Sequence, residues 1–280
     1  MAKTIAFINM KGGVGKTTLA VNTAYTLAKI EGKKVLIIDM DPQMNATQYT
    51  LKEEQMDEIL ADRSKSIFGC LSPDYVTNTV IKNEQDEENE EDDDESKWIF
   101  NVDDIFDIIP SSLDIMTLNL AATPFKLQQY IKNNLDSQYD VIIIDCPPTI
   151  SDYTKVSLLA ADLYLVPMKA DSLSVFGLPM LENYVKKSIQ GEFQHNINCV
   201  GIVLNMVIPT RLLYKKNQPI IRKKWNTLLF QNELNQCEDI VKGLDPELSG
   251  NNKYIIDMNN PTIVKQMKNI TKQLLQKGRI

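Results

Sequence analysis

The chain has 280 residues, 43 % of them hydrophobic, which is enough to fill the core of one large α/β domain or two small ones. It opens without an export signal, and no window approaches the roughly eighteen continuous apolar residues of a membrane span, which predicts a cytoplasmic protein. The net charge of -7 does not exclude a nucleic-acid partner, because ten acids lie between Glu84 and Glu95 and the rest of the chain carries +3.

The predicted elements alternate between strands and helices from the first residues. Ile5–Ile8 has the composition of a buried strand, a glycine-rich loop follows, and Thr17–Ile30 has helical spacing. Continuous apolar runs that suit strands buried on both faces recur at 35–39, 141–145, 163–167 and 200–205. This order predicts an α/β fold, a doubly wound and mostly parallel sheet flanked by helices, with ligands at the carboxyl ends of the strands. Asp39, Asp145 and Asn205 lie at those ends.

The loop after the first strand has the composition of a phosphate-binding site. It reads Lys11-Gly12-Gly13-Val14-Gly15-Lys16-Thr17-Thr18, which we call the glycine loop. Glycines let backbone N–H groups surround a phosphate, and the helix that follows adds its positive N-terminal dipole. We expect Lys16 to bind the β/γ-phosphates of ATP and the Thr17 hydroxyl to complete the shell of Mg²⁺. Met10 replaces the first glycine of the usual G-x-x-x-x-G-K-T spacing.

An additional lysine precedes the phosphate-binding one by five residues. Lys11 in this position is typical of deviant Walker ATPases, and at this point the chain resembles the ParA/MinD family. In that family the signature lysine reaches the partner's phosphates in a nucleotide-sandwich dimer. The resemblance therefore implies an ATP-dependent homodimer in which Lys11 acts in trans and the loop from Gly12 to Thr18 binds the nucleotide.

The segment after the second predicted strand strengthens the resemblance. Residues 39–47 read D-M-D-P-Q-M-N-A-T and are similar to the family's D-x-D-P-Q-x-N-x-T switch segment. A carboxylate beside the γ-phosphate can orient the attacking water, while a second can support the metal. The resemblance implies that Asp41 is the hydrolysis residue, completing a catalytic set with Lys11 and Lys16, and that Asp39 supports the metal and the loop.

Two later segments also match the family. Residues 139–148, Y-D-V-I-I-I-D-C-P-P, resemble its Walker B strand and second switch, in which Asp145 would bind Mg²⁺ through water. Residues 166–177 are similar to the segment after the family's fourth strand. Asn205 ends the strand whose asparagine the family uses near adenine, although a plain strand-terminating turn residue remains an alternative.

Residues 53 to 100 interrupt the alternation of strands and helices. The acid run from Glu84 to Glu95 cannot bury enough apolar surface to offset the entropy of ordering it. We expect one P-loop ATPase domain over residues 1–280, with an acidic, disordered insertion at about 83–97. A solvated loop without a task, an intramolecular decoy for a basic surface and a docking tail for a partner are its possible roles.

One sustained basic stretch follows the last predicted strand. Residues 211–232 contain no acid, and Tyr214 and Trp225 lie among the basic side chains. The basic residues are Arg211, Lys215, Lys216, Arg222, Lys223 and Lys224. Such a patch can bind DNA phosphates without reading sequence, and a solvated helix face is the alternative. Because partition-type members of the family carry basic residues here, the resemblance favours non-specific DNA binding.

The resemblance points to the short ParA/Soj type, because four residues before the first strand leave no room for an N-terminal helix-turn-helix unit. It implies a cytoplasmic, nucleoid-associated ATPase with weak intrinsic activity that a cargo adaptor stimulates. A ParB-type adaptor bound to a plasmid or chromosome is the first expectation for the partner, and a protein cargo is the second.

Two other functions compete with partition. A MinD-like membrane-cycling ATPase needs a C-terminal amphipathic helix, and Ile263–Ile280 has five basic residues but neither Trp nor Phe. Its apolar positions suit a helix that closes the fold, so a membrane partner is disfavoured. A reductase or metal-inserting relative needs clustered cysteines, whereas the four here are widely spaced and are expected to be reduced and mostly buried.

Overall fold

The computed structural model describes residues 1–72, 97–245 and 253–280. The strands of these residues form one seven-stranded sheet in the order β3-β4-β2-β5-β1-β6-β7. Neighbouring strands run parallel except β3 and β4, which are antiparallel. The strands are β1 (Lys3–Phe7), β2 (Val35–Asp39), β3 (Phe100–Val102), β4 (Phe106–Ile109), β5 (Val141–Asp145), β6 (Leu163–Met168) and β7 (Asn198–Leu204).

Alternate residues of the central strands face two separate hydrophobic cores. In β1, Ile5 and Phe7 belong to one core, while Ala6 and the following Ile8 belong to the other. The same alternation runs through β2 and β5, whose five residues are all buried. Strands buried on both faces read as continuous apolar runs, which explains why these strands were predictable.

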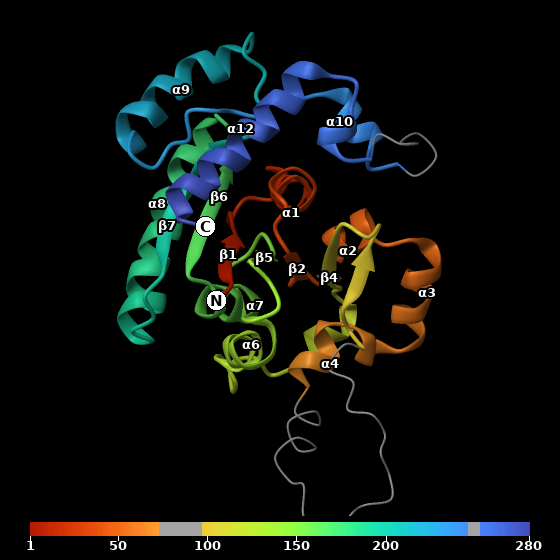
Figure 1. Cartoon of the computed structure of the whole chain (residues 1–280). Helices are drawn as coiled ribbons and strands as arrows, with labels where there is room; N and C mark the ends of the chain where they lie inside the picture. Colours follow the sequence, from red (N-terminus) through yellow and green to blue (C-terminus); the bar gives the residue numbers. More distant parts are fainter. Residues whose placement is uncertain (73–96, 246–252) are drawn as a thin grey trace, which may run out of the picture.

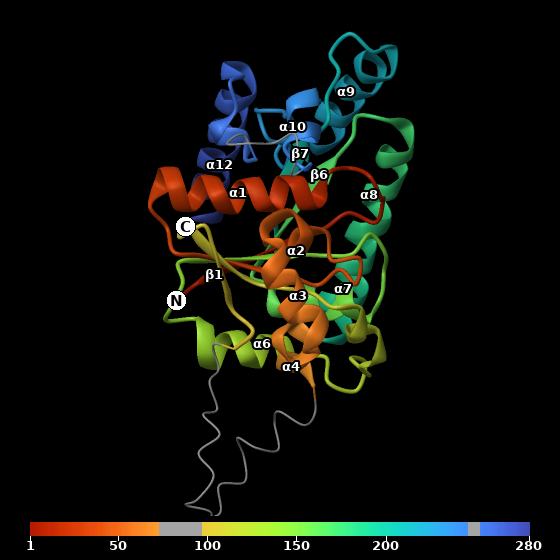
Figure 2. The same cartoon turned by 90° about the vertical axis from the view of Figure 1, so that its right-hand side faces the viewer.

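Helices cover both faces of the sheet, as a doubly wound fold requires (Figures 1 and 2). On one face lie α1 (Lys16–Glu31) and α12 (Pro261–Gly278), preceded by the 3₁₀ turn η5 (Ile255–Asp257). The other face carries the short α6 (Lys126–Tyr130), α7 (Asp152–Ala160) and α8 (Ser172–Tyr184), and α6 and α8 each continue as a π-helical segment, at Ile131–Leu135 and Val185–Glu192. The predicted fold class is confirmed.

In the described part of the chain, α9 (Leu212–Trp225) and α10 (Glu238–Lys242) lie between β7 and α12. α9 buries Asn217, Ile221 and Trp225, and the Trp225 indole N–H donates to Glu182 Oε1 of α8 at 2.9 Å. α9 therefore lies alongside α8 at one end of the molecule (Figure 1).

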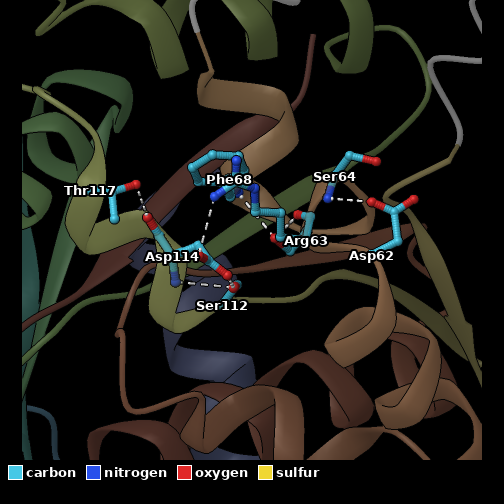
Figure 3. A network of polar contacts seen from close by, with 8 residues as sticks. Asp62, Arg63, Ser64, Phe68, Ser112, Asp114 and Thr117 are labelled. Carbon is cyan, nitrogen blue, oxygen red and sulfur yellow. Dashed lines mark hydrogen bonds and ion pairs between the residues drawn. The ribbon is translucent and has the colours of Figure 1, made fainter.

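The interruption expected from residue 53 begins as ordered structure. After α2 (Asn45–Thr50) come α3 (Glu53–Ala61), the 3₁₀ turn η1 (Arg63–Lys65) and α4 (Ile67–Leu71). Figure 3 shows how this region joins the 3₁₀ turn η2 (Leu113–Thr117) after β4: Arg63 contacts Asp114 at 3.5 Å and its guanidinium lies over the Phe68 ring at 4.5 Å. α3 buries Ile59, and α4 buries Ile67 and Leu71 in the core. The interruption of the strand-helix alternation therefore begins with ordered helices that pack on the domain, while the insertion expected at about 83–97 comes later in the chain.

The acidic insertion predicted at about 83–97 lies, except for Lys97, outside the described residues. α4, which precedes it, stands at the end of the molecule opposite α9 (Figures 1 and 2). Within residues 1–72, 97–245 and 253–280, no helix is long and apolar enough to cross a membrane. The four cysteines are free thiols, with Cys70 and Cys146 buried.

Candidate nucleotide site

The carboxyl ends of three neighbouring strands meet at one edge of the sheet. Phe7 at the end of β1 pairs with Asp145 of β5, and Asp145 pairs with Asp39 of β2. The glycine loop leaves β1 at the same level. The parallel register therefore brings together the loop and both strand-terminal aspartates, as the sequence predicts.

The glycine loop turns sharply into α1 through left-handed backbone. Gly13 has φ 67° and Gly15 has φ 76°, a region that residues with a Cβ rarely occupy. A Cβ at Gly15 would also lie 2.6 Å from the Asn205 side-chain nitrogen. That nitrogen donates to the carbonyls of Val14 and Gly15 at 2.9 and 3.2 Å, so Asn205 holds the glycine loop through two hydrogen bonds to its backbone.

A cavity of about 360 Å³ opens in front of the loop at the N-terminus of α1. Its wall includes the loop residues Gly12, Gly13, Gly15, Lys16, Thr17 and Thr18. Lys16 is 7 % exposed, and no residue in the described part of the chain forms an ion pair with its ammonium. An unpaired buried cation beside free helix N–H groups favours a polyanion. Asn205 and Val14, also predicted to bind the nucleotide, do not line this cavity, and their contact with ATP stays a prediction.

Asp145 and Thr17 form the candidate metal position. The Thr17 hydroxyl donates to Asp145 Oδ2 at 2.6 Å, whereas the buried Oδ1 has no hydrogen-bond partner among the described residues. Burial, and then the charge of Asp39, raise the pKa of Asp145. An orphaned buried carboxylate oxygen beside a hydroxyl fits Mg²⁺, whose ligands are oxygens. The described residues hold no cluster of three His, Cys, Asp or Glu side chains that could hold a metal by itself, so nucleotide and water oxygens would have to complete the shell.

The two aspartates after β2 have different surroundings. Asp39 is fully buried, and its Oδ2 accepts from both the backbone N–H and the hydroxyl of Thr47, at 2.9 and 2.8 Å. Its Oδ1 accepts from the Asp41 N–H at 3.1 Å, so Asp39 binds both ends of the segment from Asp41 to Thr47. Asp41 lines the cavity, with its Oδ1 accepting from the Gln43 N–H at 3.0 Å. The geometry suits Asp41 for work on the phosphates and Asp39 for support.

Lys11, the first residue of the glycine loop, does not line the cavity. Its Nζ forms an ion pair with Asp171 Oδ2 at 2.5 Å, and its backbone N–H donates to Asn9 Oδ1. Burial would raise the pKa of Asp171, but the hydrogen bonds from Lys11 and Ser174 lower it below its ordinary value. Asp171 is the N-cap of α8. It lies in the segment 166–177 that resembles the family, but the sequence alone did not identify it as a functional residue. The signal was present, because an acid before Ser-x-Ser at a helix start is a cap pattern.

The six predicted DNA-binding residues lie on α9 or at its N-cap, but they are not equivalent. Arg211, Lys215, Lys216, Lys223 and Lys224 are exposed. Arg222 instead donates to Glu233 Oε1 at 2.9 Å, and the other oxygen of Glu233 accepts from the Tyr214 hydroxyl at 2.6 Å. Glu233 is the first acid after the basic stretch, and it fastens one side of α9 to the fold.

The family model AAA_31, described as an AAA domain, matches residues 2–199, which include the glycine loop and both aspartate segments. The chain belongs to this family. An uncharacterised protein of Methanocaldococcus jannaschii is 30 % identical over 269 residues, which cover 93 % of each chain. The sporulation initiation inhibitor protein Soj of Bacillus subtilis is 31 % identical over 211 residues and 74 % of each chain.

The solved structures include a Borrelia burgdorferi B31 protein provisionally assigned to plasmid partition, with AMPPNP bound. Its similarity extends over 99 % of this chain and 100 % of its own, with a TM-score of 0.73 and 26 % identity. Together with the family match and Soj, it confirms the resemblance that the motifs indicated: the chain is a P-loop ATPase of the ParA/MinD type.

Proposed function

We propose that the chain is a partition-type positioning ATPase, folded as a single domain over residues 1–280, that dimerises with ATP and holds DNA while dimeric. The observation that carries the proposal is the division of labour between two lysines of one loop. Lys16 lies buried in the wall of the cavity, and Lys11 lies outside it, paired with Asp171. A lysine held outside its own phosphate site would reach a second copy's site once its ion pair with Asp171 opens.

Within the cavity, the backbone of the glycine loop and Lys16 would bind the triphosphate of ATP. Thr17 and Asp145 would hold Mg²⁺, with Asp39 supporting the loop behind them. The metal supplies positive charge to the phosphate oxygens as charge develops during hydrolysis. Asp41 would orient the attacking water, because Asp41 lines the cavity and Asp39 does not. The Asp41 backbone N–H binds Asp39, but its carboxylate accepts from the Gln43 N–H instead.

An apolar stripe on α8 supports dimerisation at this edge. Leu173, Phe176 and Met180 are 71 %, 74 % and 61 % exposed, and no charged residue lies between Ser172 and Leu181. A contiguous apolar face that is exposed on a helix is typical of a surface that binds another protein surface. The stripe begins beside Asp171 and Lys11, so a second copy that approaches the nucleotide would also cover α8. We expect Phe176→Glu to keep ATP bound and to remain a monomer in sedimentation with ATP.

The exposed face of α9 would hold DNA. It presents Arg211, Lys215, Lys216, Lys223 and Lys224 to solvent, and two copies of a weak phosphate-binding face bind a long DNA much more tightly than one. DNA retention would therefore follow the ATP-dependent dimer. The protein would be cytoplasmic and nucleoid-associated, and an adaptor of the ParB type would stimulate its weak hydrolysis and release it.

The relatives favour positioning of a cargo without fixing which cargo. Soj is named for sporulation control, another relative is the cell division protein PomZ, and the Borrelia protein is assigned to plasmid partition. A plasmid or chromosome locus is the cargo we favour, and a protein cargo is second.

A membrane-cycling function is disfavoured by the packing of α12. Its apolar face is already used, because Ile263, Met267, Ile270 and Leu274 are buried in the core shared with α1. Binding a bilayer through these side chains would require α12 to leave the fold.

Co-sedimentation with DNA and with anionic vesicles, each with and without ATP, tests the proposal. Asp41→Ala should bind ATP, hydrolyse it at a small fraction of the parental rate and accumulate as a dimer on DNA. Hydrolysis by Asp41→Ala at the parental rate would contradict the assigned role. ATP-dependent retention on vesicles but not on DNA would replace partition by the membrane function.

A further inference from the structure

We propose that Tyr49 is a positioning residue for ATP hydrolysis: its hydroxyl fastens α2, which borders the cavity, to α1 and to the chain at Lys253. The proposal rests on the proposed function, since it concerns how Asp41 is held for that reaction. It adds a residue that none of the motifs includes.

Tyr49 belongs to the cavity wall, and its hydroxyl is hydrogen-bonded inside the fold. The residue lines the cavity together with Asn45 and Gln48 and is only 6 % exposed. The hydroxyl oxygen accepts from Asn22 Nδ2 at 2.9 Å, and the hydroxyl donates to the Lys253 carbonyl at 3.1 Å. Tyr49 thus connects the cavity wall to residues about two hundred positions away in sequence.

Asn22 fixes the direction of these hydrogen bonds. It is fully buried on α1, and its Oδ1 accepts from the Ile255 N–H at 2.7 Å. Its Nδ2 donates to the Thr18 carbonyl at 2.8 Å as well as to Tyr49. With the amide oriented by a backbone donor and a backbone acceptor, Tyr49 must accept from it, and the phenolic hydrogen is left for Lys253. Each side-chain polar atom of Asn22 and Tyr49 then has a partner, which is the condition under which a buried polar network specifies one arrangement.

α2 is consequently held at both of its ends. At its start, Thr47 binds Asp39, and the Met44 N–H donates to the Asp41 carbonyl at 2.8 Å. At its end, Tyr49 binds Asn22, and Lys253 Nζ donates to the Thr50 carbonyl at 3.0 Å. The loop that carries Asp41 lies between the first anchor and β2, so its position depends on where α2 sits.

The two halves of the site should therefore respond differently to loss of the hydroxyl. ATP is bound by the glycine loop and Lys16, which belong to β1 and α1 and keep their own contacts. Asp41 depends on α2, and a displacement of about 1 Å in a positioned group can cost far more in rate than in binding. Removing the hydroxyl should lower kcat and leave ATP affinity unchanged.

The structure provides a matched control in the same aromatic cluster. The Tyr254 ring stacks on Tyr25 at 3.8 Å and lies 6.0 Å from the Tyr49 ring, but its buried hydroxyl has no hydrogen-bond partner among the described residues. Tyr49→Phe and Tyr254→Phe both remove one buried hydroxyl from one cluster. Only the first removes hydrogen bonds that hold α2.

The experiment measures kcat for ATP and the Kd of a fluorescent ATP analogue in both variants of the full chain. We expect Tyr49→Phe to lower kcat at least about fivefold, the factor for one net hydrogen bond, because the hydroxyl makes two, with Kd changed less than about twofold. Tyr254→Phe should match the parent in both quantities. A parental kcat in Tyr49→Phe, or equal losses in both variants, would overturn the proposal.

A second variant guards against a folding defect. Lys253→Met keeps the aliphatic stem and removes the bond to the Thr50 carbonyl, so it should lower kcat in the same direction by a smaller factor at an unchanged Kd. If Asp41→Ala loses hydrolysis while Tyr49→Phe and Lys253→Met retain it, the inference fails and the proposed function stands. If the parent does not hydrolyse ATP, the proposed function itself fails.

Discussion

The glycine loop and α9 are the two regions on which the proposed function depends, and they are built in opposite ways. The loop places its functional groups in fixed surroundings: Lys16 is only 7 % exposed, and the Thr17 hydroxyl is held by Asp145 at 2.6 Å. On α9 the basic side chains stand in solvent, and of the six only Arg222 is tied by an ion pair to the described fold. A site of the first kind needs particular residues at particular spacings, whereas the second kind needs only charge on one face.

The largest effect expected from this difference is at Lys16. Lys16→Ala removes a buried cation from the cavity wall, and we expect ATP affinity to fall more than about a hundredfold, because charge-assisted bonds to phosphate are among the strongest. Isothermal titration with ATP and Mg²⁺ measures it. Lys216→Ala, an equally drastic change on α9, should bind ATP like the parent; a large decrease there would erase the distinction between the two regions.

On α9 the effect should be spread over several residues. Replacing Lys215, Lys216, Lys223 and Lys224 by Gln should lower the affinity of the ATP-bound dimer for DNA by about tenfold or more near 0.1 M salt. The slope of log K against log salt should also become shallower by about 0.9 for each DNA phosphate that is no longer neutralised. Each single variant should have a small effect, measured by fluorescence anisotropy on DNA of unrelated sequences. One lysine that accounted for most of the decrease would indicate a specific interaction instead.

The difference between the regions also decided what the sequence could predict. The central strands and the loop were predictable because burial on both faces gives continuous apolar runs, and because glycines, Lys16 and Asp145 stand at fixed spacings. On α9, composition predicted a basic helix but not that Glu233, just beyond the acid-free stretch, binds Arg222. Contacts between residues distant in sequence were not encoded in any local pattern.

Three features show where local patterns were insufficient. β3 has only three residues and pairs at the sheet edge, too short for a periodic signal. α3 and α4 precede the acidic run of residues 84–95 in the sequence, and the composition of that run dominated the interpretation of residues 53–100. The partner of Lys11 could not be foreseen, because Asp171 reaches it only when β1 and β6 pair in the sheet.

Arg222 sharpens the comparison, since it belongs to α9 by sequence and to the fold by contact. Arg222→Gln leaves Glu233 without its cation, and the Glu233 side chain is only 11 % exposed. We expect the melting temperature to fall by about 2–4 °C, as about 1 kcal/mol does in a domain of this size. DNA affinity should change less than in Lys215→Gln, which should leave the melting temperature unchanged. The reverse ranking of the two variants would place Arg222 among the DNA-facing residues.

A change in melting temperature of similar size and opposite sign concerns the ionisation of Asp145 in the nucleotide-free protein. Burial raises the pKa of Asp145 in the folded chain. At a pH between the ordinary aspartate pKa and this raised pKa, the folded chain therefore keeps a proton that the unfolded chain has released. Asp145 therefore lowers stability progressively as pH rises from about 4 toward the raised pKa, and no such contribution is present below that window. Asp145→Asn removes this cost, so at pH 8 its melting temperature should exceed the parent's by about 2–4 °C, and the difference should shrink at about pH 4.

Asp171→Asn is the control of opposite sign. The pKa of Asp171 is lowered, so its ionised form stabilises the fold above the ordinary aspartate pKa, and that contribution is lost as pH falls through the lowered value. Asp171→Asn should accordingly melt below the parent at neutral pH. Thermal melts of the three proteins from about pH 4 to about pH 8 decide the matter: parallel curves for Asp145→Asn and the parent would mean that the metal position carries no ionisation cost. Diverging curves would mean that the site at Asp145 gives up stability for a buried charge that Thr17 and Lys16 relieve only in part, a cost that the exposed charges of α9 avoid.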